Sequence, residues 1–347
     1  MKALLTSPFS PISQNLTSHR SAQGAIYGDM VRQSIGDNLV INYGGKITDY
    51  SPYDTMYVYH GNDWGGTLNL FGGMQGYSNV ENVVRFSKFK GKIVSLGIDF
   101  PPYHELIGTI LRRNIENKKD IQPEWHDVDL TNLERMFNEA TTSKYPHITS
   151  KIVIGDSHSI CMYRPGWTVN SIPFKTLNGI LNTGLEVPIS DIRHINEVTA
   201  AEFYFGNIDV RHHLCRLEGS HVDNAIGLAR RYVIAVEALP IKDVSIYELL
   251  PIENESRVLP KTGYYKGKPF WGTWEERNQA RNAFNTTVEL TVKRVNFIKW
   301  TDALLNDKGE LNFKYMEKPR SIHLARSSYP YWTGEEVNTN SLESFFN

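Results

Sequence analysis

The sequence predicts an α/β fold in two domains, each built on a parallel sheet. Short runs rich in β-branched residues have the length of strands, and they alternate with longer stretches whose apolar spacing favours helices. At 347 residues the chain is long for one core. A polar connector at residues 118–145 separates the halves, so we expect a boundary near His147 and domains at residues 1–147 and 148–347.

The first domain is expected to be Rossmann-like, because its strands alternate with crossover helices. Glycine-rich turns after several of its strands could bind phosphate or sugar through backbone N–H groups, or they could simply be tight loops. None has the spacing of a phosphate-binding loop. The expected strands are residues 2–7, 38–43, 55–59 and 92–99, and the expected helices are residues 22–35 and 79–89.

The second domain opens on the most informative stretch, in which four mostly β-branched and apolar residues, 151–154, run into Gly155-Asp156-Ser157. This pattern predicts a buried strand that ends in a tight turn capped by the Asp156 carboxylate. Ser157 would then lie at the carboxyl end of a strand, where ligands bind in open α/β sheets. Later strands are expected at 202–205, 244–250 and 295–300, and helices at 132–140 (in the connector), 221–238 and 274–293.

The composition of the chain limits the kinds of binding partner and the cell compartment that we expect. A formal net charge of −1 gives no global basic field for nucleic acid, although a local patch remains open. The amino terminus has too short an apolar run for a signal peptide, and no apolar stretch is long enough to cross a membrane. Two cysteines without metal-ligand spacing favour a reducing cytoplasm. We expect a cytoplasmic protein with a small-molecule or carbohydrate substrate and no cofactor; the oligomeric state is open.

An ordered set of short motifs in the second half resembles the SGNH (GDSL-like) hydrolases. Gly155-Asp156-Ser157 is similar to their first block, Gly179 to the glycine of the second, and Gly206-Asn207-Ile208-Asp209 to the third, with the Asn one place early. His323 matches the base of the last block. The resemblance implies a flavodoxin-like, three-layer α/β/α domain.

The same resemblance implies a serine nucleophile, Ser157, and a histidine base, His323. Histidine suits this task because it exchanges protons near neutrality. Backbone N–H of Gly179 and the side chain of Asn207 would hold the oxyanion. The family has Asp three residues before the base, whereas this chain has Arg320. Asp302 or Asp209, or a backbone carbonyl, would then orient the imidazole.

Further residues are expected to contact substrate or support the site. We expect Asp156 beside the nucleophile, Asp209 and Arg211 as an ion pair beneath the site, and Arg320 either solvated or holding an anionic group. His212 and His213, read as neighbours on a strand, point to opposite faces and make a poor metal site. No metal is expected.

Residues 53–102 resemble the amino-terminal domain of bacteriophage DNA β-glucosyltransferases, through Tyr53-Asp54, Leu70-Phe-Gly-Gly73 and Asp99-Phe-Pro. That resemblance implies that Asp99 is a base acting on a hydroxymethylated nucleobase. The leading prediction is an SGNH-type esterase or acyltransferase for an O-acylated polar substrate such as a sugar. The alternatives are a phage-type enzyme that modifies DNA or a nucleotide-sugar acceptor, and a non-catalytic carbohydrate-binding protein.

Overall fold

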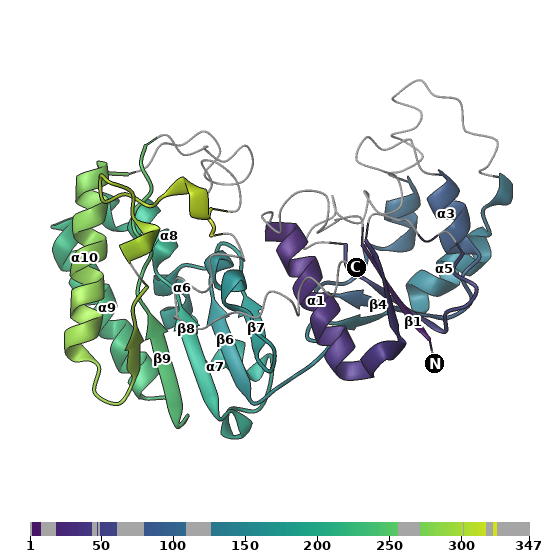
Figure 1. Cartoon of the computed structure of the whole chain (residues 1–347), viewed down its shortest axis with the longest axis horizontal. Coiled ribbons are helices and arrows are strands. Elements are labelled where there is room, and N and C mark those ends of the chain that lie inside the picture. The colour runs from purple at the N-terminus through teal and green to yellow at the C-terminus, as the bar shows by residue number, and fades with distance from the viewer. Residues whose placement is uncertain are drawn as a thin grey trace. The chain divides into compact units, whose positions relative to one another are not determined.

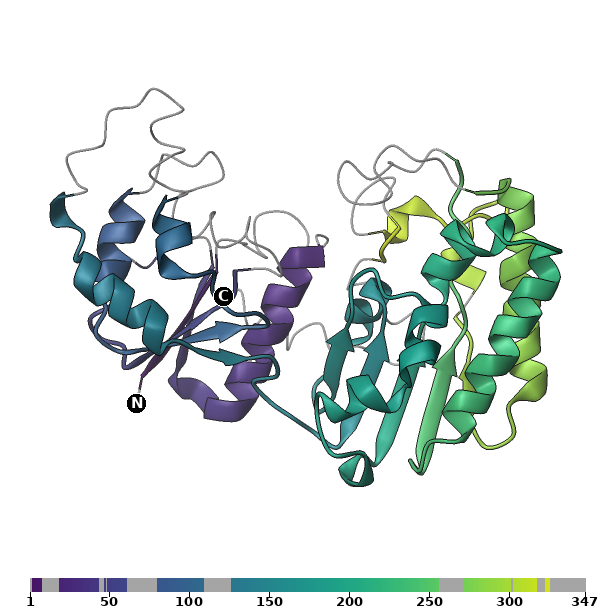
Figure 2. The same cartoon turned by 180° about the vertical axis from the view of Figure 1, so that it is seen from behind.

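The computed structural model describes residues 2–7, 19–43, 47, 49–60, 80–108, 126–255, 271–300, 302–316 and 322–324. The chain forms two compact units, with the main division between His147 and Ile148. Each unit contains one five-stranded sheet (Figures 1 and 2), and every ladder between the described strands is parallel. The fold is therefore α/β in both units, as the alternating pattern predicts.

In the first unit the strand order is β2-β1-β3-β4-β5. The central strand β1 alternates its side chains between two cores: Leu4 packs with the side chains of α3 and α5, and Leu5 packs with Val31 of α1. Figure 1 shows these helices on opposite faces of the sheet, which gives three layers. The elements are β1 Ala3–Ser7, α1 His19–Ile35, β2 Leu39–Tyr43, β3 Thr55–Val58, α3 Val80–Ser87, β4 Lys92–Leu96, α5 Leu130–Glu139 and β5 Thr141–Ser143.

In the second unit the order is β10-β9-β8-β6-β7. Counted from its own first strand this is 2-1-3-4-5, the order of flavodoxin-like sheets, and the first unit has the same order. The strand β7 lies on one side of β6, and the later strands β8, β9 and β10 lie on the other side. The carboxyl ends of β6 and β8 therefore flank the crevice where ligands bind in such folds. The strands are β6 Lys151–Gly155, β7 Thr168–Ser171, β8 Ala200–Tyr204, β9 Asp243–Tyr247 and β10 Asn296–Ile298.

Two long helices of this unit, α9 and α10, pack side by side (Figure 1). Ser220 caps α9 through its side chain, and Thr273 with Glu276 forms a capping box on α10. The helices of the unit are α6 Leu177–Thr183, α7 Glu186–Ser190, α8 Asn207–His212, α9 His221–Glu237 and α10 Trp274–Thr291, with short 3₁₀ turns η4 Ser157–Met162, η6 Leu214–Arg216 and η7 Asp302–Leu304.

Three details differ from the sequence-based expectations. Strands β5 and β7 were not predicted, because both are short and polar and lack an apolar run. Residues 207–212 form helix α8 rather than a strand, so His212 is helical and the argument from opposite strand faces does not apply to it. In a separate respect, none of the described helices has both the length and the apolar character needed to cross a membrane, and none was expected to.

Candidate active site at the end of β6

The strand β6 is buried on both faces, since Ile152, Val153 and Ile154 have no exposed surface. It ends at Gly155, where a Cβ atom would meet the Tyr204 carbonyl oxygen of β8 and lie 2.6 Å from the Ser159 Cβ. Only glycine permits this approach. The chain then turns into η4, whose first residue is Ser157.

Asp156 fixes this turn. Its backbone N–H donates to the Tyr204 carbonyl at 3.1 Å, and its carboxylate Oδ1 accepts the His158 backbone N–H at 2.9 Å. The Asp156 carbonyl accepts the Ser159 and Ser171 hydroxyls, at 2.8 and 3.1 Å. Asp156 is completely buried and caps the turn, as expected; it does not reach the surface, so we correct its expected contact with substrate.

Ser157 and His323 are 166 residues apart in the sequence but are in contact in the fold. The Ser157 Oγ and the His323 Nε2 lie 2.8 Å apart, and both residues are partly buried. His323 follows Met316, and an isolated bridge between Met316 and Leu324 fixes the segment that carries it. The two side chains expected as nucleophile and base are thus in direct hydrogen-bond contact, which is the arrangement that general-base activation of a hydroxyl requires.

A second histidine supports the first. The His158 ring packs against the His323 ring with centroids 4.8 Å apart, and its Nδ1 lies 2.8 Å from Asp156 Oδ1. Burial lowers the pKa of His158, and this outweighs the raising influence of the Asp156 carboxylate. A neutral His158 therefore donates its Nδ1–H to Asp156 and presents a fixed ring to His323. The signal for His158 in the sequence is the Asp-x-His spacing directly around the serine.

The expected acidic partners of His323 lie elsewhere. Asp302 is exposed at the start of η7, and its side chain makes no hydrogen bond to His323 or to any other described residue. Asp209 is buried, and its carboxylate accepts the backbone N–H groups of Leu177 at 2.6 Å and Asn178 at 3.1 Å. Arg320, which stands where the family has Asp, lies outside the described residues.

The expected ion pair between Asp209 and Arg211 is wrong. Both lie on α8, two residues apart, and side chains at that spacing do not face each other on a helix. Arg211 instead pairs with Glu253, at 2.7 and 2.9 Å, and both side chains are buried. Burial raises the pKa of Asp209 to about 6, despite its two backbone hydrogen bonds. Sequence reasoning did not find Glu253, which stands 42 residues further along the chain.

The two expected oxyanion donors, Gly179 and Asn207, differ in whether their N–H groups already have a hydrogen-bond partner. The Gly179 N–H already donates to the Thr176 hydroxyl at 3.0 Å, in the amino-terminal cap of α6. This bond competes with the expected oxyanion role. Asn207 is buried; its Oδ1 lies 3.4 Å from both the Tyr204 hydroxyl and the Leu250 N–H, and its Nδ2 has no hydrogen-bond partner among the described residues. Of the two, Asn207 is the one whose donor group has no hydrogen-bond partner among the described residues.

Asp99, the candidate base of the first unit, follows β4 and is exposed. Its carboxylate accepts a hydrogen bond from the Thr142 hydroxyl of β5. It is neither a buried cap of the following prolines nor one member of a wider cluster of described acid–base groups. No group of described His, Cys, Asp or Glu residues has the geometry of a metal site.

Comparison with known proteins gives a distant structural likeness and no family. No family model and no curated protein matches the chain. Among solved structures, a protein from Streptococcus pneumonia that is provisionally described as a platelet activating factor is similar to 58% of this chain, over 85% of its own length, at 16% identity and a TM-score of 0.37. A likeness this distant carries no argument about activity.

Proposed function

We propose that the second unit is a serine ester hydrolase or acyltransferase that acts on an O-acylated polar substrate such as a carbohydrate. The observation that carries this proposal is the 2.8 Å contact between Ser157 Oγ and His323 Nε2 at the carboxyl end of β6. The rigid turn around Asp156 supports it, because a nucleophile gains most when its position is fixed before substrate binds.

In the proposed reaction the Ser157 Oγ attacks the ester carbonyl carbon while its proton passes to His323 Nε2. The carbonyl oxygen becomes an oxyanion, and the Asn207 side-chain amide is our candidate donor to it. As the tetrahedral intermediate collapses, the C–O bond to the alcohol breaks and His323 returns the proton to the departing oxygen. Water, or the hydroxyl of an acceptor, then attacks the acyl-serine with His323 again as base.

The orientation of His323 is assigned to the pair formed by His158 and Asp156. In related triads a carboxylate holds the base directly. Here the carboxylate of Asp156 holds His158, and the His158 ring packs on the base. A neutral ring beside the imidazolium stabilises it less than a carboxylate would, so we expect modest rates with simple esters.

A serine-directed fluorophosphonate probe tests the proposal. The wild-type chain should be labelled at Ser157, and Ser157→Ala and His323→Ala should not be labelled. Ser190→Ala, which removes an exposed serine at the end of α7, is the matched control and should be labelled like the wild type. Labelling that persists in Ser157→Ala would contradict the proposal, as would an unlabelled wild-type chain.

The glycosyltransferase-like alternative remains a prediction. Its candidate base, Asp99, is exposed and accepts a hydrogen bond from Thr142, which neither retires nor favours it. Binding of the chain to duplex DNA at several salt concentrations would test it, because phosphate contacts release counterions.

A further inference from the structure

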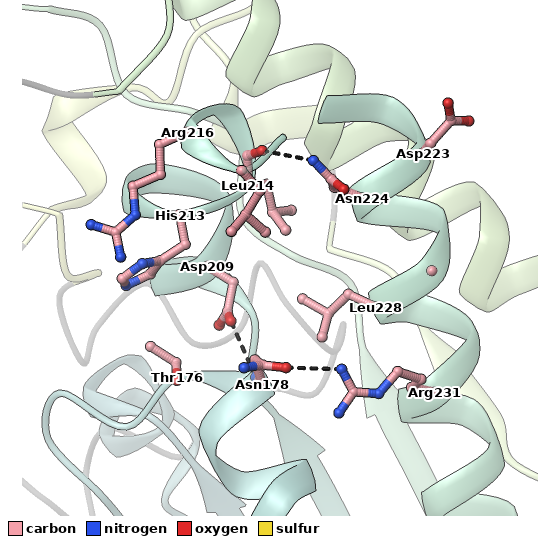
Figure 3. A pocket seen from close by; sticks show the side chains of 12 residues that line it. Thr176, Asn178, Asp209, His213, Leu214, Arg216, Asp223, Asn224, Leu228 and Arg231 are labelled. Atoms are coloured by element: carbon pink, nitrogen blue, oxygen red, sulfur yellow. Dashed lines mark hydrogen bonds between the residues drawn. The ribbon is translucent and has the colours of Figure 1, made fainter. Parts of the chain in front are cut away.

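A pocket of about 550 Å³ lies between α6, the α8–η6 segment and the first turns of α9 (Figure 3). Its size is within the range of about 300–1,000 Å³ typical of small-molecule sites. Its walls come from segments that follow β7 and β8, and therefore from the carboxyl edge of the sheet, where ligands bind in this fold. Neither Ser157 nor His323 is among its described lining residues.

Two guanidinium groups of this pocket lack a compensating charge. Arg231 donates to the side-chain amides of Asn178 at 2.8 Å and Asn182 at 3.0 Å, which fix its plane but leave its charge intact. Arg216 is exposed, and its guanidinium forms no hydrogen bond or ion pair with any described residue. In Figure 3 the Arg216 guanidinium lies beside the His213 ring, while the carboxylate of Asp223 points away from both.

Beside these cations the pocket offers hydrogen-bond acceptors and an apolar wall. The Asp209 carboxylate faces the space between His213 and Asn178 (Figure 3). The backbone N–H groups of Leu177 and Asn178 each use one lone-pair site, on different oxygens of this carboxylate. A carboxylate has about four such sites, so it can accept further hydrogen bonds. Leu214 and Leu228 supply buried apolar surface between the polar groups.

We propose that this pocket binds a small polyhydroxylated anion, a sugar acid or a sugar phosphate. The two guanidinium groups lie on opposite sides of the pocket (Figure 3), so one would hold the carboxylate or phosphate, which its planar fork matches, and the other would donate to oxygen atoms at the far end of the ligand. Hydroxyl groups of the ligand would donate to Asp209, and the carbon face of its ring would lie against Leu228. The assignment goes beyond the esterase proposal and does not depend on Ser157 being a nucleophile.

Titration calorimetry on the full chain tests the assignment, with glucuronate, galacturonate and glucose 6-phosphate as anionic probes. Glucose and inorganic phosphate are the single-feature controls. We expect at least one anionic sugar to bind about 10-fold more tightly than either control. The affinities of the uronates and of the sugar phosphate show whether the pocket prefers a carboxylate or a phosphate. Absence of binding by all three anionic sugars at about 10 mM would overturn the proposal, and so would equal binding of glucose.

Substitutions of the two arginines test whether the ligand binds in this pocket. Arg216→Gln and Arg231→Gln should each weaken binding of the anionic sugar about 10-fold and leave the melting temperature unchanged. Arg230→Gln is the matched control, since Arg230 is exposed on the same helix and does not line the pocket. Binding that survives both substitutions would place the ligand elsewhere and contradict the proposal. The same titrations with Ser157→Ala should match the wild type, so that loss of esterase activity and loss of this site are read separately.

Discussion

Both units contain a serine–histidine hydrogen bond of the same length, but the two pairs differ in exposure and in their other hydrogen bonds, and we propose a nucleophile in only one of them. In the first unit His60 Nε2 lies 2.8 Å from Ser95 Oγ, and in the second His323 Nε2 lies 2.8 Å from Ser157 Oγ. Ser95 and His60 are completely buried, whereas Ser157 and His323 are partly exposed.

The first pair is distinguished by which side chain donates the hydrogen bond. Ser95 donates its hydroxyl proton to the Ile98 carbonyl, so His60 is the donor to the Ser95 oxygen and cannot act as its base. The His60 ring also stacks on Phe100, with centroids 4.9 Å apart. The two sheets have the same strand order, so topology alone does not decide which strand end becomes reactive.

The largest effect should follow from removing one serine of each pair. Ser157→Ala should lower the rate of ester hydrolysis at least about 10³-fold, because the nucleophile is lost. Ser95→Ala should keep the rate and cost about 1–3 kcal/mol of stability, since it removes the buried hydroxyl that hydrogen-bonds to the His60 ring and to the Ile98 carbonyl. Kinetics with a chromogenic ester, together with thermal unfolding, measure both quantities. A comparable rate loss in both variants would mean that the contrast between the pairs is wrong.

A second difference concerns ion pairs. Arg211→Met in the second unit should lower the free energy of unfolding by about 3–5 kcal/mol, because it removes the guanidinium that pairs with the buried Glu253 carboxylate. Arg135→Met in the first unit breaks a solvent-exposed pair with Glu139 and should cost less than about 0.5 kcal/mol. Scanning calorimetry of the full chain can follow the two units as separate transitions. Equal costs would contradict the assigned burial.

One carboxylate of each unit should also contribute to stability with the opposite dependence on pH. The pKa of Asp209 in the folded chain is raised from 3.8 to about 6 by burial, so the folded state binds more protons than the unfolded state between about pH 4 and 6. Its contribution to stability is present below pH 4 and falls as pH rises to 6, by up to about 3 kcal/mol.

Asp209→Asn should remove this dependence, so its stability relative to the wild type should improve from pH 4 to pH 6 in denaturant titrations. In the first unit the pKa of Asp129 is lowered, mainly by the Asn132 backbone N–H that it caps. Its contribution is present above the unfolded pKa and is lost as pH falls. A flat difference between Asp209→Asn and wild type would contradict the raised pKa.

The smallest effect should come from Asp302. Because Asp302 is exposed and makes no hydrogen bond to His323, Asp302→Asn should change kcat/KM by no more than about twofold. His158→Phe, which keeps a ring but loses the bond to Asp156, should lower kcat far more and leave KM nearly unchanged. A large loss in Asp302→Asn with none in His158→Phe would restore Asp302 as the orienting residue.

The sequence predicted the elements with strong periodicity and missed those without it. Strand β6 and the turn at Ser157 were visible because a β-branched run meets Gly-Asp-Ser, and His323 stood out through the resemblance. The pairing of Arg211 with Glu253 could not be predicted, since it depends on how a loop after β9 returns to α8. The pocket could not be predicted for the same reason: Arg216 of η6 and Arg231 of α9 line one space only because α9 packs beside both η6 and α6.

Gly155 bears on how this protein can vary. Any side chain at this position would push β6 away from the Tyr204 carbonyl and from Ser159, and the displacement would pass directly to the residue two places later. We therefore expect a combinatorial library around the turn to return glycine at 155 under selection for the proposed activity. Arg216 is exposed and lies on another element, so we expect its substitution to leave the turn at Ser157 in place. Under the two proposals, the ligand that the pocket binds would then vary independently of the nucleophile.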